Sequence, residues 1–149
     1  MKAHRYLIDT NVALDLLLAR EPFEYDAMHI FSLAELGEID LVLSSDAIST
    51  IGYHISKNKD KQAARQAIAL LLDFVSLAPL DESTVLKALS LDFSDIEDAL
   101  VASAADAAGA RAIITRNGAD FAKSSIPAIS PKEFLSIRSQ EMKAKQQNS

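Results

Sequence analysis

The sequence predicts an α/β fold in which helices cover both faces of a central parallel sheet. Short apolar runs typical of buried strands alternate along the chain with longer helical segments, and this alternation favours parallel strands joined by right-handed crossovers. The 149 residues suit one domain, since a chain of this length buries roughly 70% of its unfolded surface without disulfides or metals. Residues 1–140 are therefore expected to form a single domain.

The first half of the chain contains two strand-like runs. The run at 4–8 ends at Asp9, Thr10 and Asn11, whose side chains all favour helix N-caps. A continuous apolar run at 41–44 is typical of a strand buried on both faces. The helical segments of this half end at glycine or at charged turns, and they are expected at 12–19, 22–37, 47–57 and 62–73.

The second half continues this alternation. Strand-like runs occur at 75–78, 112–115 and 126–129, and helices are expected at 81–91, 94–108 and 130–140. Ser94 with Glu97, and Ser130 with Glu133, match capping boxes, in which a hydroxyl and a carboxylate three residues apart satisfy free backbone N–H groups. The polar residues 141–149 are expected to form a disordered C-terminal tail.

Composition excludes several classes of functional site. The chain contains no cysteine, which rules out disulfides, thiol catalysis and cysteine-bound metals, and its three histidines lack the spacing of a metal cage. No apolar stretch is long enough to cross a bilayer, and the N-terminus lacks the apolar core of a signal peptide. The expected location is therefore cytoplasmic, with no membrane partner. With a net charge of −6, the protein must hold any polyanionic substrate locally, through a metal ion or a basic patch.

Acidic side chains follow the carboxyl ends of the predicted strands, where parallel sheets place their ligand sites. Asp9 follows the first strand directly, and Asp95 and Asp98 share one face of a helix in the second half. Asn117 and Asp120 follow the strand at 112–115. Each residue taken singly also suits a cap, a turn or a solvated surface. Carboxylates gathered together would raise one another's pKa in the absence of a cation, and such oxygen ligands suit magnesium or manganese.

Three short motifs around these residues follow one another along the chain. They are Leu7-Ile-Asp9-Thr-Asn11-Val, Asp98-Ala-Leu-Val-Ala102-Ser-Ala104 and Ile113-Ile-Thr115-Arg-Asn117-Gly-Ala-Asp120-Phe121. Together they resemble the motifs of PIN-domain ribonucleases, which include the VapC-like toxins of bacterial toxin–antitoxin systems. The resemblance runs from Tyr6 to about Phe134. It implies a PIN-like three-layer α/β/α sandwich whose carboxylates bind Mg²⁺ or Mn²⁺ for the hydrolysis of RNA.

The resemblance also implies roles for individual residues. Carried over position by position, it makes Asp9, Asp98 and Asp120 the catalytic residues and the metal ligands. Further residues of the motifs that it implies as auxiliary members of the pocket are Asn11, Thr115 and Asn117.

One position departs from the family pattern. The family's second acidic residue, a glutamate, falls on Thr50, whose neutral hydroxyl is a poor metal ligand. Asp46 lies one helical turn before Thr50, and Asp95 lies one turn before Asp98, so either carboxylate would be a substitute. The sequence alone leaves both substitutes open.

These observations predict a Mg²⁺- or Mn²⁺-dependent endoribonuclease that hydrolyses RNA phosphodiester bonds as the toxin of a toxin–antitoxin pair. The expected partners are RNA, an antitoxin protein and a second copy of the chain. The alternative is a catalytically impaired PIN-like module that binds RNA or a partner protein without cleavage, and Thr50 favours it. The sequence contains no glycine-rich phosphate-binding motif that would favour a nucleotide-binding fold instead.

Basic residues could also follow an RNA backbone. They are Arg116 beside the site and the cluster of Lys57, Lys59, Lys61 and Arg65.

Overall fold

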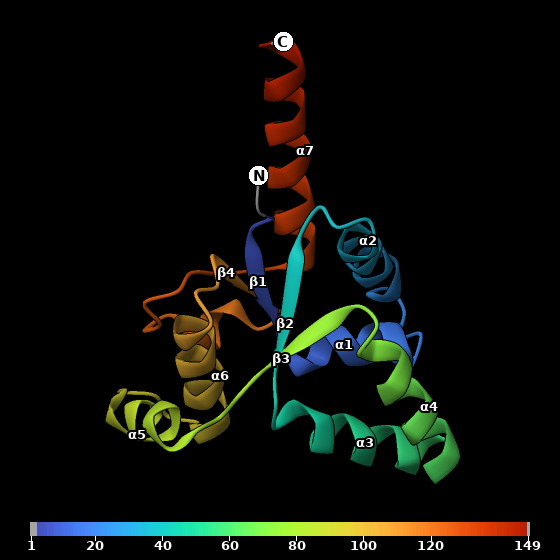
Figure 1. The fold of residues 1–149 in the computed structure, drawn as a ribbon, viewed down its shortest axis with the longest axis vertical. Helices are drawn as coiled ribbons and strands as arrows, with labels where there is room; N and C mark the ends of the chain where they lie inside the picture. The colour runs from blue at the N-terminus through green and yellow to red at the C-terminus, as the bar shows by residue number, and fades with distance from the viewer. Residues whose placement is uncertain (1–2, 149) are drawn as a thin grey trace.

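The computed structural model describes residues 3–148, and at its centre lies a five-stranded sheet in which every strand pair is parallel (Figure 1). The strands are β1 (Arg5–Ile8), β2 (Asp40–Ser44), β3 (Val75–Ala78), β4 (Ala112–Ile114) and β5 (Ala128–Ile129), in the spatial order β3-β2-β1-β4-β5. The central strand β1 pairs with both β2 and β4. The carboxyl ends of these three strands therefore meet at one edge of the sheet.

Seven helices cover the two faces of this sheet in the described residues. They are α1 (Thr10–Leu17), α2 (Glu24–Glu35), α3 (Ala47–Asn58), α4 (Lys61–Leu71), α5 (Glu82–Ser90), α6 (Ile96–Ala107) and α7 (Pro131–Gln147). Figure 1 shows α5 and α6 on one side of the strands and α1 to α4 on the other. The layers confirm the predicted α/β/α sandwich.

Alternation along each strand builds a separate apolar core on each face. Leu7, Val42 and Ile113 pack with α6, whereas the flanking Tyr6 and Ile8 pack in the core beneath α1 to α4. All of these side chains are buried. Because strands covered on both faces carry apolar residues at successive positions, they read in the sequence as continuous apolar runs.

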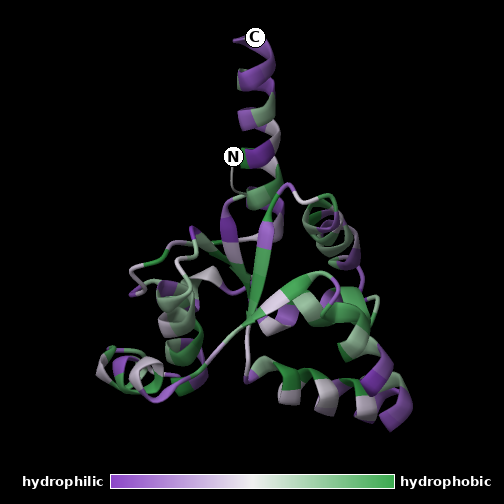
Figure 2. Ribbon diagram, in the orientation of Figure 1, coloured by the Kyte–Doolittle hydropathy of each residue, from purple (hydrophilic) through white to green (hydrophobic). Residues whose placement is uncertain are grey.

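The C-terminal helix is longer than the sequence suggested. The expected helix end near Gln140 and the disordered tail from 141 are wrong for residues 141–147, which continue α7 to Gln147. These residues are mostly glutamate, lysine, alanine and glutamine, which favour helix although they are polar. Figure 2 shows this outer part of α7 as largely hydrophilic, extending away from the sheet. Ser149 lies outside the described residues.

The cap of α6 also differs from the expectation. Asp95 is the N-cap, and its side chain accepts a hydrogen bond from the Glu97 backbone N–H at 2.8 Å, so the capping box predicted at Ser94 does not form. A carboxylate at this position also interacts favourably with the positive end of the helix dipole, which a serine hydroxyl does not. At α7 the predicted cap is confirmed, because Ser130 Oγ accepts from the Glu133 N–H at 3.0 Å.

No helix in the part of the chain that the structure describes is long and apolar enough to span a membrane.

The cap assignment makes a prediction about stability. Asp95→Ala removes the hydrogen-bond acceptor, whereas Asp95→Asn keeps an acceptor and removes only the charge. We expect Asp95→Ala to unfold about 1 kcal/mol more easily than Asp95→Asn in urea titrations. Ser94→Ala should stay within about 0.5 kcal/mol of the parent, as surface substitutions away from caps usually do. A larger loss of unfolding free energy for Ser94→Ala than for Asp95→Ala would mean that Ser94, rather than Asp95, caps α6.

Candidate active site

A polar cavity of about 310 Å³ lies at the carboxyl ends of β1, β2 and β4. It is bordered by the start of α1, by α3, by the start of α6 and by the loop between β4 and the 3₁₀ helix η1 (Gly118–Phe121). The polar side chains that line it are Asp9, Thr10, Asn11, Arg20, Asp46, Thr50, His54, Glu97, Asp98, Arg116 and Asn117. The structure thus brings together six of the nine predicted catalytic, metal-binding and auxiliary residues, together with Arg116.

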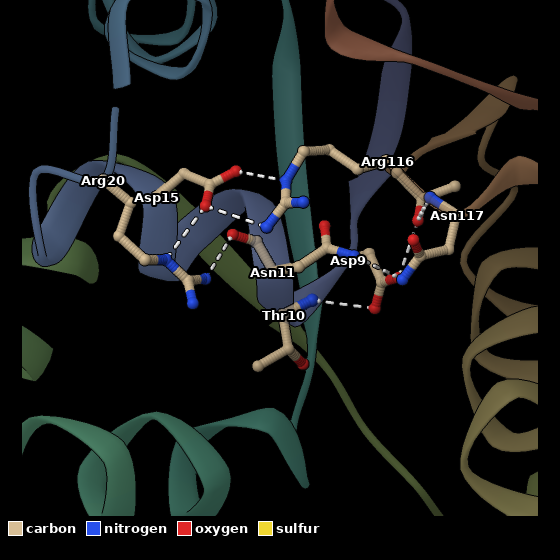
Figure 3. A network of polar contacts seen from close by, with 8 residues as sticks. Asp9, Thr10, Asn11, Asp15, Arg20, Arg116 and Asn117 are labelled. Carbon is tan, nitrogen blue, oxygen red and sulfur yellow. Dashed lines mark hydrogen bonds and ion pairs between the residues drawn. The ribbon is translucent and has the colours of Figure 1, made fainter. Parts of the chain in front are cut away.

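Asp9 is fixed by hydrogen bonds from two elements (Figure 3). As the N-cap of α1 it accepts from the Thr10 backbone N–H at 2.8 Å, and its second oxygen accepts from Thr115 Oγ1, also at 2.8 Å. The buried Thr115 hydroxyl in turn accepts from the Asn117 N–H at 3.0 Å. Burial raises the pKa of Asp9, and the two hydrogen bonds partly oppose that rise.

Asp98 carries the strongest electrostatic perturbation of the site. Burial, followed by the charges of nearby carboxylates, raises the pKa of Asp98 to about 6. The carboxylates responsible are those of Asp95, Asp120, Asp9 and Glu97. Negative charge therefore accumulates at this point of the site.

Asp120 and Asp95 lie at the periphery of this group. Asp120 is exposed and lines a neighbouring cavity of about 300 Å³ rather than the cavity of Asp9 and Asp98. It is nevertheless close enough for its charge to raise the pKa of both of those residues. Asp95 is exposed and occupied as the cap of α6.

One face of α3 lines the cavity. Asp46 precedes the helix, and Thr50 and His54 follow at intervals of four residues, so all three side chains point to the same side. Asp46 also accepts a hydrogen bond from the buried Ser44 hydroxyl. The predicted position of Thr50 thus faces the acidic residues, and His54, which the sequence did not single out, shares its face. The four-residue spacing between Thr50 and His54 is the sequence signal that could have identified it.

Asp15 connects two arginines beside this cavity. It is 1% exposed, and it accepts from Arg116 Nε at 2.7 Å and from Arg116 Nη2 at 3.1 Å. Arg20 Nε forms an ion pair with the same carboxylate, lying 3.0 Å from Asp15 Oδ1, the oxygen that also accepts from Arg116 Nη2. Sequence reasoning missed both Asp15 and Arg20. The available signal was a single acidic residue within the apolar run of α1.

The other predicted basic residues lie elsewhere. Lys57, Lys59, Lys61 and Arg65 are exposed around the turn between α3 and α4, and none of them lines this cavity. Only Arg116 among the predicted RNA contacts is placed at the site.

The donor set fits a hard divalent cation. Within residues 3–148, no three carboxylate or imidazole groups are close enough to hold one ion together. Mg²⁺, however, commonly binds through one or two carboxylates and keeps several waters. Asp9 and Asp98 supply two carboxylates, and the cavity-lining Asn11 contributes a buried amide oxygen that has no hydrogen-bond partner among the described residues. Oxygen donors alone, with excess negative charge, match this cation chemistry.

The raised pKa of Asp98 predicts how stability depends on pH. Its folded-state pKa of about 6 exceeds the ordinary value of 3.8, so the folded protein binds this proton more tightly than the unfolded chain. The associated stability is present below about pH 4 and is lost as pH rises through about 6. In a metal chelator, Asp98→Asn should therefore be more stable than the parent near pH 8, with the difference shrinking toward about pH 4.5.

Urea unfolding at both pH values tests this expectation. Asp73→Asn, at an exposed carboxylate after α4, provides a control for the loss of one negative charge. Equal stabilisation by the two variants near pH 8 would mean that net charge, rather than crowding around Asp98, sets the effect.

The chain matches the PIN domain family over residues 5–119. It is 27% identical over 139 residues to Ribonuclease VapC1 of Aquifex aeolicus (strain VF5), and the match covers 90% of this chain and 95% of that protein.

Solved structures share the fold. VapBC2 from Rickettsia felis, bound to a DNA fragment from its promoter, aligns with a TM-score of 0.67 and 18% identity, covering 85% of this chain and 98% of that chain. VapC20 from Mycobacterium tuberculosis, a toxin that cleaves the sarcin–ricin loop, aligns with a TM-score of 0.64 and 15% identity, covering 78% and 93%. The strand order, the polar edge of the sheet and the family match agree, and the chain belongs to the PIN domain family.

Proposed function

We propose that this protein is a divalent-metal-dependent endoribonuclease and the toxin of a toxin–antitoxin pair. The VapC1 ribonuclease relative, which aligns over 90% of this chain, supports an RNA substrate. The carrying observation is the convergence of charge on Asp98, whose pKa is raised to about 6 by burial and four neighbouring carboxylates. Such repulsion does not favour folding, whereas a group of carboxylates provides the oxygen ligands that a cation-dependent hydrolase uses.

The chain's own residues divide the work of hydrolysis. Asp9 and Asp98 would hold Mg²⁺ or Mn²⁺, with Asp120 and the Asn11 amide oxygen beside them. When bound there, such a cation would supply charge neutralisation at the phosphate and would lower the pKa of a water. Thr10 and Thr115 fix the orientation of the Asp9 carboxylate through their hydrogen bonds. Arg116 lines the same cavity and would bind a phosphate of the RNA.

A catalytically impaired module that binds RNA or a protein is the second candidate. Thr50 occupies the helix face where the family has a glutamate, and it presents a neutral hydroxyl to the cavity. The missing charge would weaken a second cation more than the first, because Asp9 and Asp98 are both retained. Cleavage assays separate the two candidates.

Protein partners are also part of the proposal. Several solved neighbours are VapBC or toxin–antitoxin complexes, which supports an antitoxin for this chain. The chain offers exposed apolar side chains for protein contacts, on α2 and α4 (Tyr25, Met28, Leu70) and on α5 and α6 (Leu86, Leu89, Ile96). We also propose a homodimer, which light scattering on the purified chain would test.

The proposed location of the protein is the cytoplasm. An RNA substrate and the absence of cysteine both suit a cytoplasmic protein.

The metal-dependent function predicts both stabilisation and cleavage. Millimolar Mn²⁺ or Mg²⁺ should raise the melting temperature, because an ion that binds only the folded state adds about 2.7 kcal/mol at a hundredfold excess over its Kd. The parent should cleave single-stranded RNA with the metal and not with EDTA. Asp98→Asn should lose most of both effects, whereas Asp73→Asn should keep them. RNA binding without any cleavage by the parent would favour the impaired module. A parent melting temperature that does not change with Mn²⁺ or Mg²⁺ would contradict the proposed metal site.

The departure at Thr50 predicts a gain of function. Thr50→Glu places a carboxylate on the cavity-lining face of α3, so we expect tighter Mn²⁺ binding, seen as a larger thermal shift, and faster cleavage. Ser49→Glu adds the same charge at an exposed neighbour on α3 and should do neither. If Asp46 already acts as the substitute ligand, Asp46→Asn should abolish cleavage and Thr50→Glu should add little. Silence of both variants would mean that this face of α3 does not contact the metal.

A further inference from the structure

A second cavity adjoins the candidate active site. Its volume is about 350 Å³, and it is lined by Phe23, Asp26, Arg116, Ser130, Pro131 and Lys132. These residues come from the start of α2, the start of α7 and the loop after β4. Arg116 lines both this flanking cavity and the cavity of Asp9 and Asp98. A ligand that continues from one cavity into the other must therefore pass this guanidinium.

Arg116 is held rigidly between the two cavities. Its guanidinium carbon lies 3.9 Å from the centroid of the Phe23 ring, and its nitrogens donate twice to the buried Asp15 carboxylate (Figure 3). This bidentate pairing prevents the arginine from turning onto the carboxylates of Asp9 and Asp98.

The same network leaves a net positive charge at the rim of both cavities. Arg20 also pairs with Asp15, so two guanidinium groups share one carboxylate. Arg20 Nε lies 3.0 Å from the Asp15 carboxylate, and Arg20 Nη2 donates to the Asn11 carbonyl at 3.2 Å. On a chain of net charge −6, this is a local binding element for an anion.

The flanking cavity has the chemistry of a nucleotide site. Phe23 lines this cavity with 39% of its surface exposed while Arg116 lies over its ring, so the exposed part of the ring can contact a base. Lys132 is exposed in the first turn of α7 and takes part in no ion pair of residues 3–148. Single-stranded RNA is bound by this combination of an aromatic platform and cationic phosphate contacts. Asp26 would repel a phosphate but can accept hydrogen bonds from the amino groups of a base.

We propose that the flanking cavity binds the nucleotide next to the scissile phosphate, with its base stacked on Phe23 and its phosphate held by Arg116 and Lys132. The proposal rests on the ribonuclease function and adds a second substrate site to it. The volume of about 350 Å³ accommodates one nucleotide rather than a folded RNA element. Substrates should therefore be single-stranded at this position.

The test measures binding of a fluorescein-labelled, 12-nucleotide, mixed-sequence single-stranded RNA by anisotropy, in EDTA and at low salt. We expect Phe23→Ala and Phe23→Leu to raise the Kd by roughly 5-fold to 100-fold, the range of one lost base stack. Lys132→Gln should weaken binding and reduce the slope of log Kd against log salt by roughly 0.7, the value for one phosphate contact. The Phe23 variants should leave that slope unchanged.

Matched controls separate these effects from surface chemistry and from folding. Leu36→Ala removes an exposed apolar side chain at the far end of α2, the helix that Phe23 caps, and Lys143→Gln removes a charge from the outer part of α7. Both variants should bind RNA as the parent does. Thermal melts report the fold of every variant. Because Phe23→Leu keeps apolar bulk beneath Arg116, binding equal to that of the parent would overturn base stacking.

The outcomes distinguish this inference from the proposed function. If the parent cleaves the RNA with Mn²⁺ while Phe23→Ala, Phe23→Leu and Lys132→Gln bind it unchanged, the nucleotide site is wrong and the ribonuclease stands. If the parent neither binds nor cleaves the RNA, both proposals fall. Weakened binding by Phe23→Leu together with the altered salt slope of Lys132→Gln supports the nucleotide site.

Discussion

Repulsion between carboxylates at one edge of the sheet is the constraint around which this structure is organised. Because β1 pairs in parallel with both β2 and β4, the chain segments that follow these strands must meet at the same edge. The start of α6 adds Asp98 to this edge, and burial, followed by the neighbouring carboxylates, raises the pKa of Asp98, while burial is also the main cause of the raised pKa of Asp9. Two apolar cores, one on each face of the sheet, supply the favourable free energy that keeps these segments together.

Hydrogen bonds help to determine how far the pKa of each carboxylate is raised. Asp9 sits deepest, and the N–H of Thr10 and the hydroxyl of Thr115 compensate part of the cost of its burial. Asp98 receives no comparable compensation and is surrounded by four acidic neighbours, so its pKa rises furthest. This repulsion is unfavourable for the carboxylates by themselves, and a bound cation of the kind proposed for the site would relieve it.

The buried Asp15 carboxylate pairs with the positive charges beside the cavity. With 1% of its surface exposed, its carboxylate depends on its ion pairs with Arg116 and Arg20, because an unpaired charge at this depth would be strongly destabilising. The pairing also keeps both guanidinium groups at the rim rather than on the acidic residues. Positive and negative groups therefore remain separated within one cavity, an arrangement that suits the cation and the RNA of the proposed function.

The sequence by itself determined the features that depend on local patterns. Apolar runs and helix caps are properties of neighbouring residues, and they predicted the parallel sheet, the strands to within a few residues and the placement of Asp9 and Asp98 after strand ends or at a helix start. The same local patterns were ambiguous where two neighbouring residues both suit a helix N-cap, as Ser94 and Asp95 do before α6. They also misjudged residues 141–147, whose polarity suggested disorder although their helix propensity is high.

Only the tertiary structure decided which side chains meet. Asp15 and Arg116 are 101 positions apart in sequence, and no local pattern connects an acidic residue in α1 with an arginine after β4. The tertiary structure likewise placed Asp120 in a neighbouring cavity, His54 in the cavity of Asp98, and Phe23 against Arg116. Periodicity fixes the face of an element on which a residue lies, whereas contacts between elements are set by how the two apolar cores pack the helices against the sheet.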